Sequence, residues 1–123
     1  MQLRNVLVLL VEDDPLIALD LRLTLEAAGA TVIGPAHSLD VASDLLAKHT
    51  IDVAVLDHLI VGGDSLPLAD ELCRRGLGFV FHTSHRGVIP QRYPDVPVID
   101  KPSRPGELVA AVKALAEMAS RCR

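Results

Sequence analysis

An unbroken apolar run near the start of the chain does most to limit what the sequence can fold into. Residues 6–11 (VLVLLV) contain no polar side chain and show no alternation. A strand with one solvated face alternates apolar and polar residues, whereas a strand inside a parallel sheet is covered on both faces and is apolar throughout. A membrane span would need about 20 such residues. The run therefore predicts a central strand of a parallel sheet.

Further short apolar runs alternate with helical patterns along the rest of the chain. We expect additional strands at 31–33, 51–56, 79–81 and 96–99. A helix should begin after the first strand, because Asp14 is a carboxylate cap and Pro15 suits the first helical position. Strands that alternate with helices predict an α/β fold, a doubly wound five-stranded parallel sheet in the flavodoxin-like order 2-1-3-4-5.

The third and fourth helices have less regular sequence patterns than the other predicted helices. The third helix is expected to turn Leu68, Leu72 and Cys73 toward the core. The stretch from Ser84 to Asp95 contains one glycine and two prolines, and an interior proline costs a helix about 3 kcal/mol. We therefore expect a degraded fourth helix of one turn at most.

Length, charge and cysteine content limit the organisation and the partners of the chain. The 123 residues match the usual size of one domain, so we expect a single domain at 1–123 with no output domain. The net charge of −4 argues against a nucleic-acid partner, which would require a basic surface, and no segment suggests a membrane. Two cysteines are too few for a secreted disulfide framework, which predicts a cytoplasmic protein.

Polar residues follow four of the predicted strands at their carboxyl ends. These ends share one edge of a parallel sheet, where open α/β folds bind ligands. Several carboxylates in one crevice repel one another and require a cation, and hard oxygen ligands at an open site favour Mg²⁺. A lysine and a hydroxyl beside that ion could bind the oxygens of a phosphoryl group carried by a carboxylate nucleophile. The residues are Glu12, Asp13 and Asp14 after the first strand, Asp57 after the third, Thr83 and Ser84 after the fourth, and Lys101 after the fifth.

These residues in this order resemble the receiver domain of two-component response regulators. The matching elements are Glu12-Asp13-Asp14-Pro15, Leu56-Asp57, Thr83-Ser84 and Lys101-Pro102, and together they cover essentially the whole chain. The resemblance implies a signalling switch that accepts a phosphoryl group from a histidine kinase or a histidine phosphotransfer protein in a Mg²⁺-dependent phosphorelay. It also implies self-phosphorylation and slow autodephosphorylation rather than turnover of an external substrate, and signalling through a downstream protein partner.

The resemblance assigns a role to each residue of the metal site. Asp57 would be both the phosphoacceptor and a ligand of the metal. Asp13 would be a direct ligand, and Glu12 would act largely through water. The backbone carbonyl of Leu59 would complete the ligands that the protein supplies.

The remaining two site residues would bind the phosphoryl group. By the same resemblance, Lys101 would bridge Asp57 and a phosphoryl oxygen, and Thr83 would move to hydrogen-bond that group. The Lys101–Pro102 peptide bond would be cis, as it commonly is in the family.

Several residues depart from the receiver pattern. Val98 stands where many receivers carry an aromatic switch residue, and the polar His58 directly follows Asp57. These departures support an alternative, a pseudo-receiver that takes no phosphoryl group and serves as a protein-interaction module. A small flavodoxin-like enzyme is disfavoured, because the loop after the first strand is acidic and would repel a nucleotide or flavin phosphate.

Two further sequence features bear on the subgroup and on the phosphodonor. Phe81 and Thr83 fit a stand-alone subgroup with Phe-Ala-Thr-Gly-X-Tyr after the fourth strand, although Ser84 replaces its Gly and Arg86 replaces its Tyr. Leu19 and Leu23 fall off the core face of the first helix. We expect them to form an apolar strip on which the helices of the phosphodonor dock.

Overall fold

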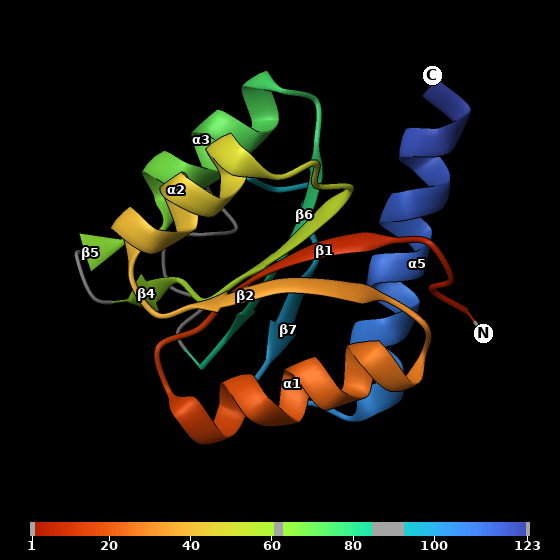
Figure 1. Cartoon of the computed structure of the whole chain (residues 1–123), viewed down its shortest axis with the longest axis horizontal. Helices are drawn as coiled ribbons and strands as arrows, with labels where there is room; N and C mark the ends of the chain where they lie inside the picture. Colours follow the sequence, from red (N-terminus) through yellow and green to blue (C-terminus); the bar gives the residue numbers. More distant parts are fainter. Residues whose placement is uncertain (1, 61–62, 85–92, 123) are drawn as a thin grey trace.

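Five parallel strands form the central sheet, as the sequence predicts. A computed structural model describes residues 2–60, 63–84 and 93–122. The strands lie in the order β2-β1-β3-β6-β7, and every neighbouring pair is parallel (Figure 1). This is the doubly wound order 2-1-3-4-5 expected for a flavodoxin-like sheet. The strands are β1 (Leu7–Val11), β2 (Thr31–Ala36), β3 (Val53–Leu56), β6 (Gly78–Thr83) and β7 (Val98–Asp100).

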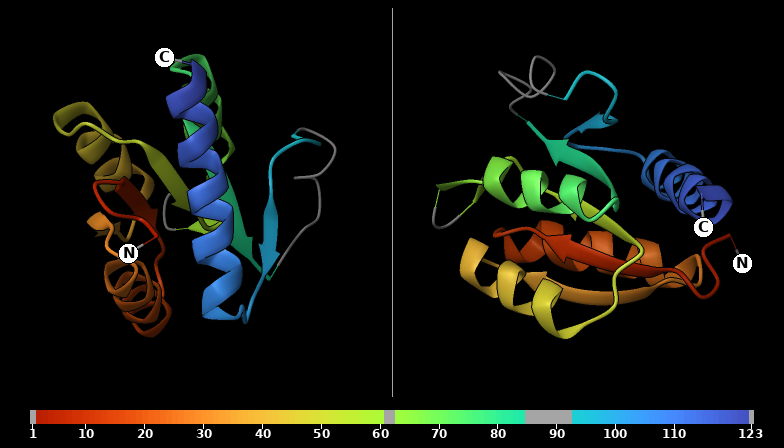
Figure 2. Two further views of the ribbon diagram at one scale, coloured as in Figure 1. Left: turned by 90° about the vertical axis from the view of Figure 1, so that its right-hand side faces the viewer. Right: turned by 90° about the horizontal axis from the view of Figure 1, so that it is seen from above.

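Helices cover both faces of this sheet and give the molecule three layers (Figures 1 and 2). Val8 and Leu10 of β1 belong to the buried cluster that contains core residues of α1 and α5. Leu9 and Val11 belong to the cluster that contains core residues of α2 and α3. This two-sided burial is why the first strand has no polar residue. The helices are α1 (Pro15–Ala27), α2 (Leu39–Lys48), α3 (Leu66–Arg74) and α5 (Pro105–Cys122).

Helix α1 begins where the sequence predicts. The Asp14 side chain accepts hydrogen bonds from the backbone N–H groups of Leu16 at 2.9 Å and Ile17 at 3.2 Å, and Pro15 occupies the first turn. These bonds satisfy amide donors that have no partner inside the helix. Gly29, with φ of 102°, follows the C-terminal end of the helix, where a glycine in this conformation commonly ends a helix.

Strand β2 is longer than predicted. We expect it to end at Ile33, but it continues through Gly34 and Pro35 to Ala36. Gly34 adopts φ of 108°, and the pairing with β1 shifts register there before Ala36 pairs with Val11. The Gly34–Pro35 bond is cis. A glycine at positive φ thus forms a bulge inside the strand instead of ending it.

Other differences from the sequence expectations are local. Two short strands that lie outside the predicted ones, β4 (Leu59–Ile60) and β5 (Gly63–Asp64), pair antiparallel after Asp57. Strand β7 is an edge strand, as expected, but begins at Val98, after Pro97.

The inward orientation expected for Cys73 is wrong. Its side chain is exposed, because each helical residue is rotated about 100° from the one before it, and α3 buries Leu68, Ala69 and Leu72. The degraded fourth helix expected at 84–95 falls mainly on residues 85–92, which lie outside the described residues. Within the described part of the chain, no helix combines the length and hydrophobicity needed to cross a bilayer.

The bulge in β2 generates a prediction about stability. A Cβ atom at position 34 would lie 2.8 Å from both the Ala36 nitrogen and the Leu10 carbonyl oxygen. We expect Gly34→Ala to lower the free energy of unfolding by about 2–4 kcal/mol, measured by urea denaturation. Gly106→Ala is the matched control, because no atom lies within 4 Å of its added methyl group. Equal effects of the two substitutions would contradict the role assigned to Gly34.

Candidate functional site

Two buried carboxylates meet at the carboxyl ends of β1 and β3. Val11 pairs with Leu56 across these strands, so the next residues, Glu12 and Asp57, lie side by side. The Asp57 backbone N–H donates to the Val11 carbonyl oxygen at 3.0 Å. Glu12 is 1% exposed and Asp57 is 7% exposed. Burying two neighbouring carboxylates costs free energy unless a positive group lies beside them.

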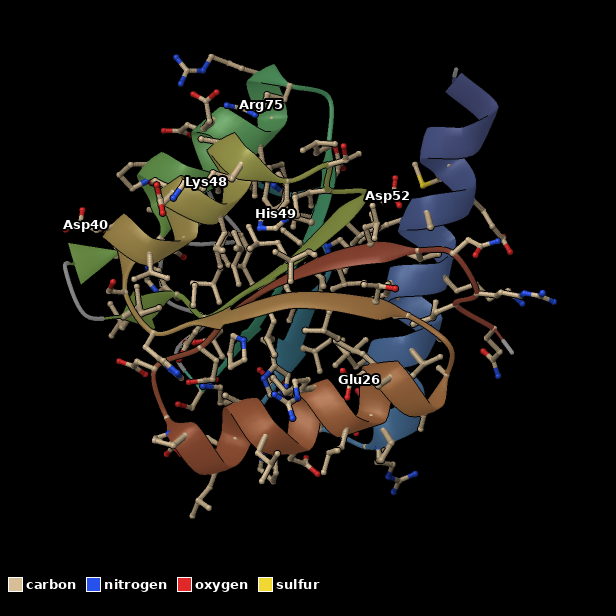
Figure 3. The ribbon with its side chains drawn as sticks, in the orientation of Figure 1. Glu26, Asp40, Lys48, His49, Asp52 and Arg75 are labelled. Atoms are coloured by element: carbon tan, nitrogen blue, oxygen red, sulfur yellow. The ribbon has the colours of Figure 1, made fainter. Side chains whose placement is uncertain are left out.

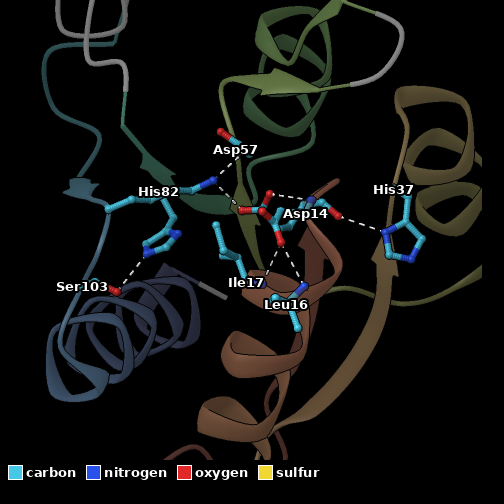
Figure 4. A network of polar contacts seen from close by, with 9 residues as sticks. Asp14, Leu16, Ile17, His37, Asp57, His82 and Ser103 are labelled. Carbon is cyan, nitrogen blue, oxygen red and sulfur yellow. Dashed lines mark hydrogen bonds and ion pairs between the residues drawn. The ribbon is translucent and has the colours of Figure 1, made fainter.

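Lys101 supplies that positive charge from the carboxyl end of the edge strand β7. It directly follows β7, and its backbone N–H donates to the Thr83 carbonyl oxygen at 3.0 Å. Its Nζ lies 2.8 Å from Asp57 Oδ2 and 2.6 Å from Glu12 Oε1 (Figure 4). Three residues from three strand ends therefore meet in one ion-pair network.

The network changes the protonation equilibria of its members. Burial raises the pKa of Glu12 above its usual value, and the negative charge of Asp57 acts in the same direction, against the hydrogen bonds from Lys101 and the Asp14 amide. Burial by itself would lower the pKa of Lys101, but the hydrogen bonds and charges of Asp57 and Glu12 outweigh it and raise that pKa. Lys101 is accordingly held as a cation at neutral pH.

Asp13 joins the two buried carboxylates in a cluster suited to a hard metal ion. Oxygen atoms of Glu12, Asp13 and Asp57 all lie within 4.8 Å of one another. Apart from its ion pair with Lys101, the buried Glu12 Oε1 accepts no hydrogen bond from the described residues. Carboxylate oxygens at a partly open edge are the ligands that Mg²⁺ prefers, so this donor set fits that ion. Asp14, in contrast, uses its side chain to cap α1.

The structure brings four of the predicted residues together and places the other two nearby. Glu12, Asp13, Asp57 and Lys101 converge. Thr83 is fully buried at the end of β6 and contacts Lys101 through its backbone carbonyl. Leu59 lies in β4, two residues after Asp57, with an exposed side chain. The Lys101–Pro102 bond is cis, which confirms that prediction.

Sequence reasoning did not assign a role to His82, which lies next to the site. Its ring is 3% exposed, and its Nε2 atom forms a 2.8 Å hydrogen bond with Ser103 Oγ (Figure 4). In the sequence, His82 directly follows the apolar residues of the predicted strand at 79–81.

The aromatic side chains of the described residues pack against one another. The ring of Tyr93 packs edge-on against Phe79, with centroids 5.4 Å apart, and against Phe81 at 6.3 Å. Its hydroxyl donates to the Asp70 carboxylate on α3. No pattern in the sequence predicts this contact, because Tyr93 lies in an irregular segment outside the predicted strands.

Comparisons with known proteins place this geometry among signalling domains. No protein-family model matches the sequence, and no curated protein matches it. Among solved structures, SdrG from Sphingomonas melonis is 35% identical, with a TM-score of 0.79 over 89% of this chain and 95% of that chain. The CheY-like response regulator receiver domain protein from Methanospirillum hungatei is 18% identical, with a TM-score of 0.86 over 96% of this chain and 98% of that chain.

A third neighbour gives the same result. The signal receiver domain of a modulated diguanylate cyclase from Desulfovibrio desulfuricans is 25% identical, with a TM-score of 0.85 over 95% of this chain and 98% of that chain. The five-stranded parallel sheet in the order β2-β1-β3-β6-β7 agrees with the fold of these neighbours. The chain belongs to the family of response regulator receiver domains.

Proposed function

We propose that this chain is a single-domain response regulator that accepts a phosphoryl group on Asp57 from a histidine kinase or a histidine phosphotransfer protein. The observation that supports this most directly is the position of Lys101 Nζ, 2.8 Å from Asp57 Oδ2, beside a cluster of three carboxylates. A nucleophilic carboxylate next to a fixed cation is the arrangement that phosphoryl transfer requires.

The transfer exchanges one bond to phosphorus for another. An oxygen of Asp57 forms the new P–O bond while the P–N bond of the donor's phosphohistidine breaks, and the departing imidazole takes up a proton. Lys101 binds a phosphoryl oxygen, and the Thr83 hydroxyl donates to another. This change of hydrogen-bond partners at the ends of β6 and β7 alters the surface that a downstream protein binds.

The acidic cluster would hold Mg²⁺ during this step. Asp13 and Asp57 would be direct ligands, Glu12 would act largely through water, and the carbonyl of Leu59 would add a further oxygen. When bound, the ion neutralises the negative charge that builds up on the phosphoryl oxygens.

Helix α1 provides the docking surface for the phosphodonor. Leu16, Leu19 and Leu23 are 79%, 47% and 53% exposed and follow helical spacing along one side of the helix. Leu16 lies in the first turn, next to Asp14 and the acidic edge. An apolar strip that begins at the site suits the helices of a donor protein, which must bring its histidine to Asp57. Such donors present their histidine in the cytoplasm, so we propose that the chain acts there.

A second candidate function is a pseudo-receiver that binds partners without phosphorylation. The observation that favours it is the Glu12–Lys101 ion pair at 2.6 Å, since Lys101 itself offsets part of the negative charge of the cluster. The buried His58 after Asp57 and Val98 in β7 point the same way. The subgroup with Phe-Ala-Thr-Gly-X-Tyr stays a prediction under either function.

Replacing the proposed phosphoacceptor tests the main function. We expect Asp57→Asn to abolish uptake of the phosphoryl group from phosphoramidate, measured by mass spectrometry of the intact protein. Its free energy of unfolding should change by no more than about 1 kcal/mol, because loss of the Lys101 contact is offset by weaker repulsion of Glu12. Asp40→Asn on the exposed surface of α2 is the control (Figure 3). Retained labelling of the Asp57→Asn protein would show that another residue accepts the group.

Substitutions of the neighbouring residues Asp13 and Asp14 should have different effects, one on metal binding and the other on helix capping. We expect Asp13→Ala to weaken Mg²⁺ binding by at least about tenfold in isothermal titration calorimetry, since it removes a ligand. Asp14→Ala should leave Mg²⁺ binding nearly unchanged and lower the free energy of unfolding by about 1 kcal/mol, since it removes the cap of α1. Equal losses of Mg²⁺ affinity would mean that the wrong carboxylate has been assigned.

A phosphoryl mimic distinguishes the two candidate functions. With Mg²⁺ and beryllofluoride, a phosphorylatable receiver should show amide chemical-shift changes at Asp57 and Thr83 in NMR spectra. Asp57→Asn, recorded under the same conditions, should show none. Spectra of the unmodified protein that do not change would favour the pseudo-receiver.

A further inference from the structure

A partly buried hydrogen bond joins the end of β6 to the segment that carries Lys101. His82 lies between Phe81 and Thr83 in β6, and both of these neighbours are fully buried. Its Nε2 atom lies 2.8 Å from Ser103 Oγ, across to the segment between β7 and α5 (Figure 4). Ser103 comes two residues after Lys101. The bond therefore connects β6, which ends in Thr83, to the segment that follows Lys101 in the chain.

The hydrogen bond completes the support of the Lys101 backbone. On the strand side, the Lys101 N–H donates to the Thr83 carbonyl oxygen, and His82 pairs with Ile99 in the sheet. On the other side, the His82–Ser103 bond holds the residues that follow. With both in place, the position of the Lys101 Cα atom is defined relative to β6, and the side chain reaches Asp57 and Glu12 from a fixed start.

An open pocket lies beside this segment. A pocket of about 450 Å³ opens between α1 and the segment, lined by Ile17 and Leu21 on one side and by Lys101, Pro102 and Ser103 on the other. Pro102 is exposed. Because van der Waals contacts are lost across such a space, the directional hydrogen bond from the buried His82 ring contributes to positioning the backbone of this segment.

The charge state of the ring suits this role. Burial lowers the pKa of His82, and the nearby positive charge of Lys101 lowers it further, against the weaker effects of Asp57, Asp20 and Glu107. The ring is therefore neutral at pH 7 and adds no second positive charge beside Lys101.

We propose that the His82–Ser103 hydrogen bond positions Lys101 against Asp57 and Glu12, so that His82 and Ser103 are positioning residues for the lysine. The consequence for phosphoryl transfer rests on the proposed function, whereas the consequence for the Lys101 contacts does not. Without the bond, the segment after Lys101 can shift into the pocket, and the Nζ atom spends less time between the two carboxylates.

The experiment compares Ser103→Ala with Ser103→Thr, which retains the hydroxyl, and with Arg104→Ala, an exposed neighbour outside the bond. The first measurement is the NMR exchange rate of the Lys101 ammonium protons with water, in the protein without phosphodonor. The second is the rate of phosphoryl uptake from phosphoramidate. Both are repeated for His82→Phe, and uptake is also measured in a Lys101→Ala background.

We expect Ser103→Ala to speed exchange at Lys101 and to slow uptake by roughly three- to tenfold, the factor that corresponds to about one hydrogen bond. Ser103→Thr and Arg104→Ala should behave as the unmodified protein. In the Lys101→Ala background, Ser103→Ala should slow uptake no further, which a merely structural defect would not reproduce.

Unchanged Lys101 exchange in Ser103→Ala would overturn the proposal, and so would an equal loss of uptake in the Lys101→Ala background. If the unmodified protein takes up no phosphoryl group, the proposed function fails, and the exchange rate still decides whether the bond positions Lys101. If His82→Phe does not fold, Ser103→Ala carries the test, because it keeps the buried ring in place.

Discussion

The buried contact of Lys101 with Glu12 and Asp57 is the interaction on which the site depends. The two carboxylates are buried at the carboxyl edge of the sheet. Desolvation disfavours their charged forms there, and the two negative charges repel each other. One ammonium group within 2.8 Å of both offsets this repulsion. Because these groups are hydrogen-bonded and only slightly solvated, removing Lys101 would leave buried carboxylates without a positive partner, which costs more than the loss of an exposed ion pair.

The sheet order makes this contact possible. Glu12, Asp57 and Lys101 come from strands that are far apart in the sequence but whose carboxyl ends share one edge. Asp52 marks the opposite end of the sheet, where its carboxylate accepts from the Leu7 N–H at 2.9 Å (Figure 3). Polar groups thus cap both ends of strands whose middle portions are apolar and covered by helices.

The face of the sheet beside β7 shows how this receiver departs from the common pattern. Val98 pairs with Phe81 in the sheet and leaves no aromatic ring in β7. Instead, Tyr93 packs on Phe79 and Phe81, and its hydroxyl reaches Asp70 on α3. Phe81 is two residues before Thr83 on the same side of β6, so the end of that strand is in contact with an aromatic group supplied by a different position.

Elements that are marked by a pattern of neighbouring residues could be predicted from the sequence. Two-sided burial of β1, the Asp14 cap of α1 and the polar residues at each strand end were all readable, because periodicity, capping and strand termini depend on neighbouring residues. Only the tertiary structure decided that β2 continues past Gly34, that Cys73 faces outward, and that His82 bonds to Ser103. Each of these depends on a partner distant in the chain: the register of β1, the packing of α3 against the sheet, and the segment after Lys101. Such contacts leave no pattern among adjacent residues, because they exist only once the sheet has brought the segments together.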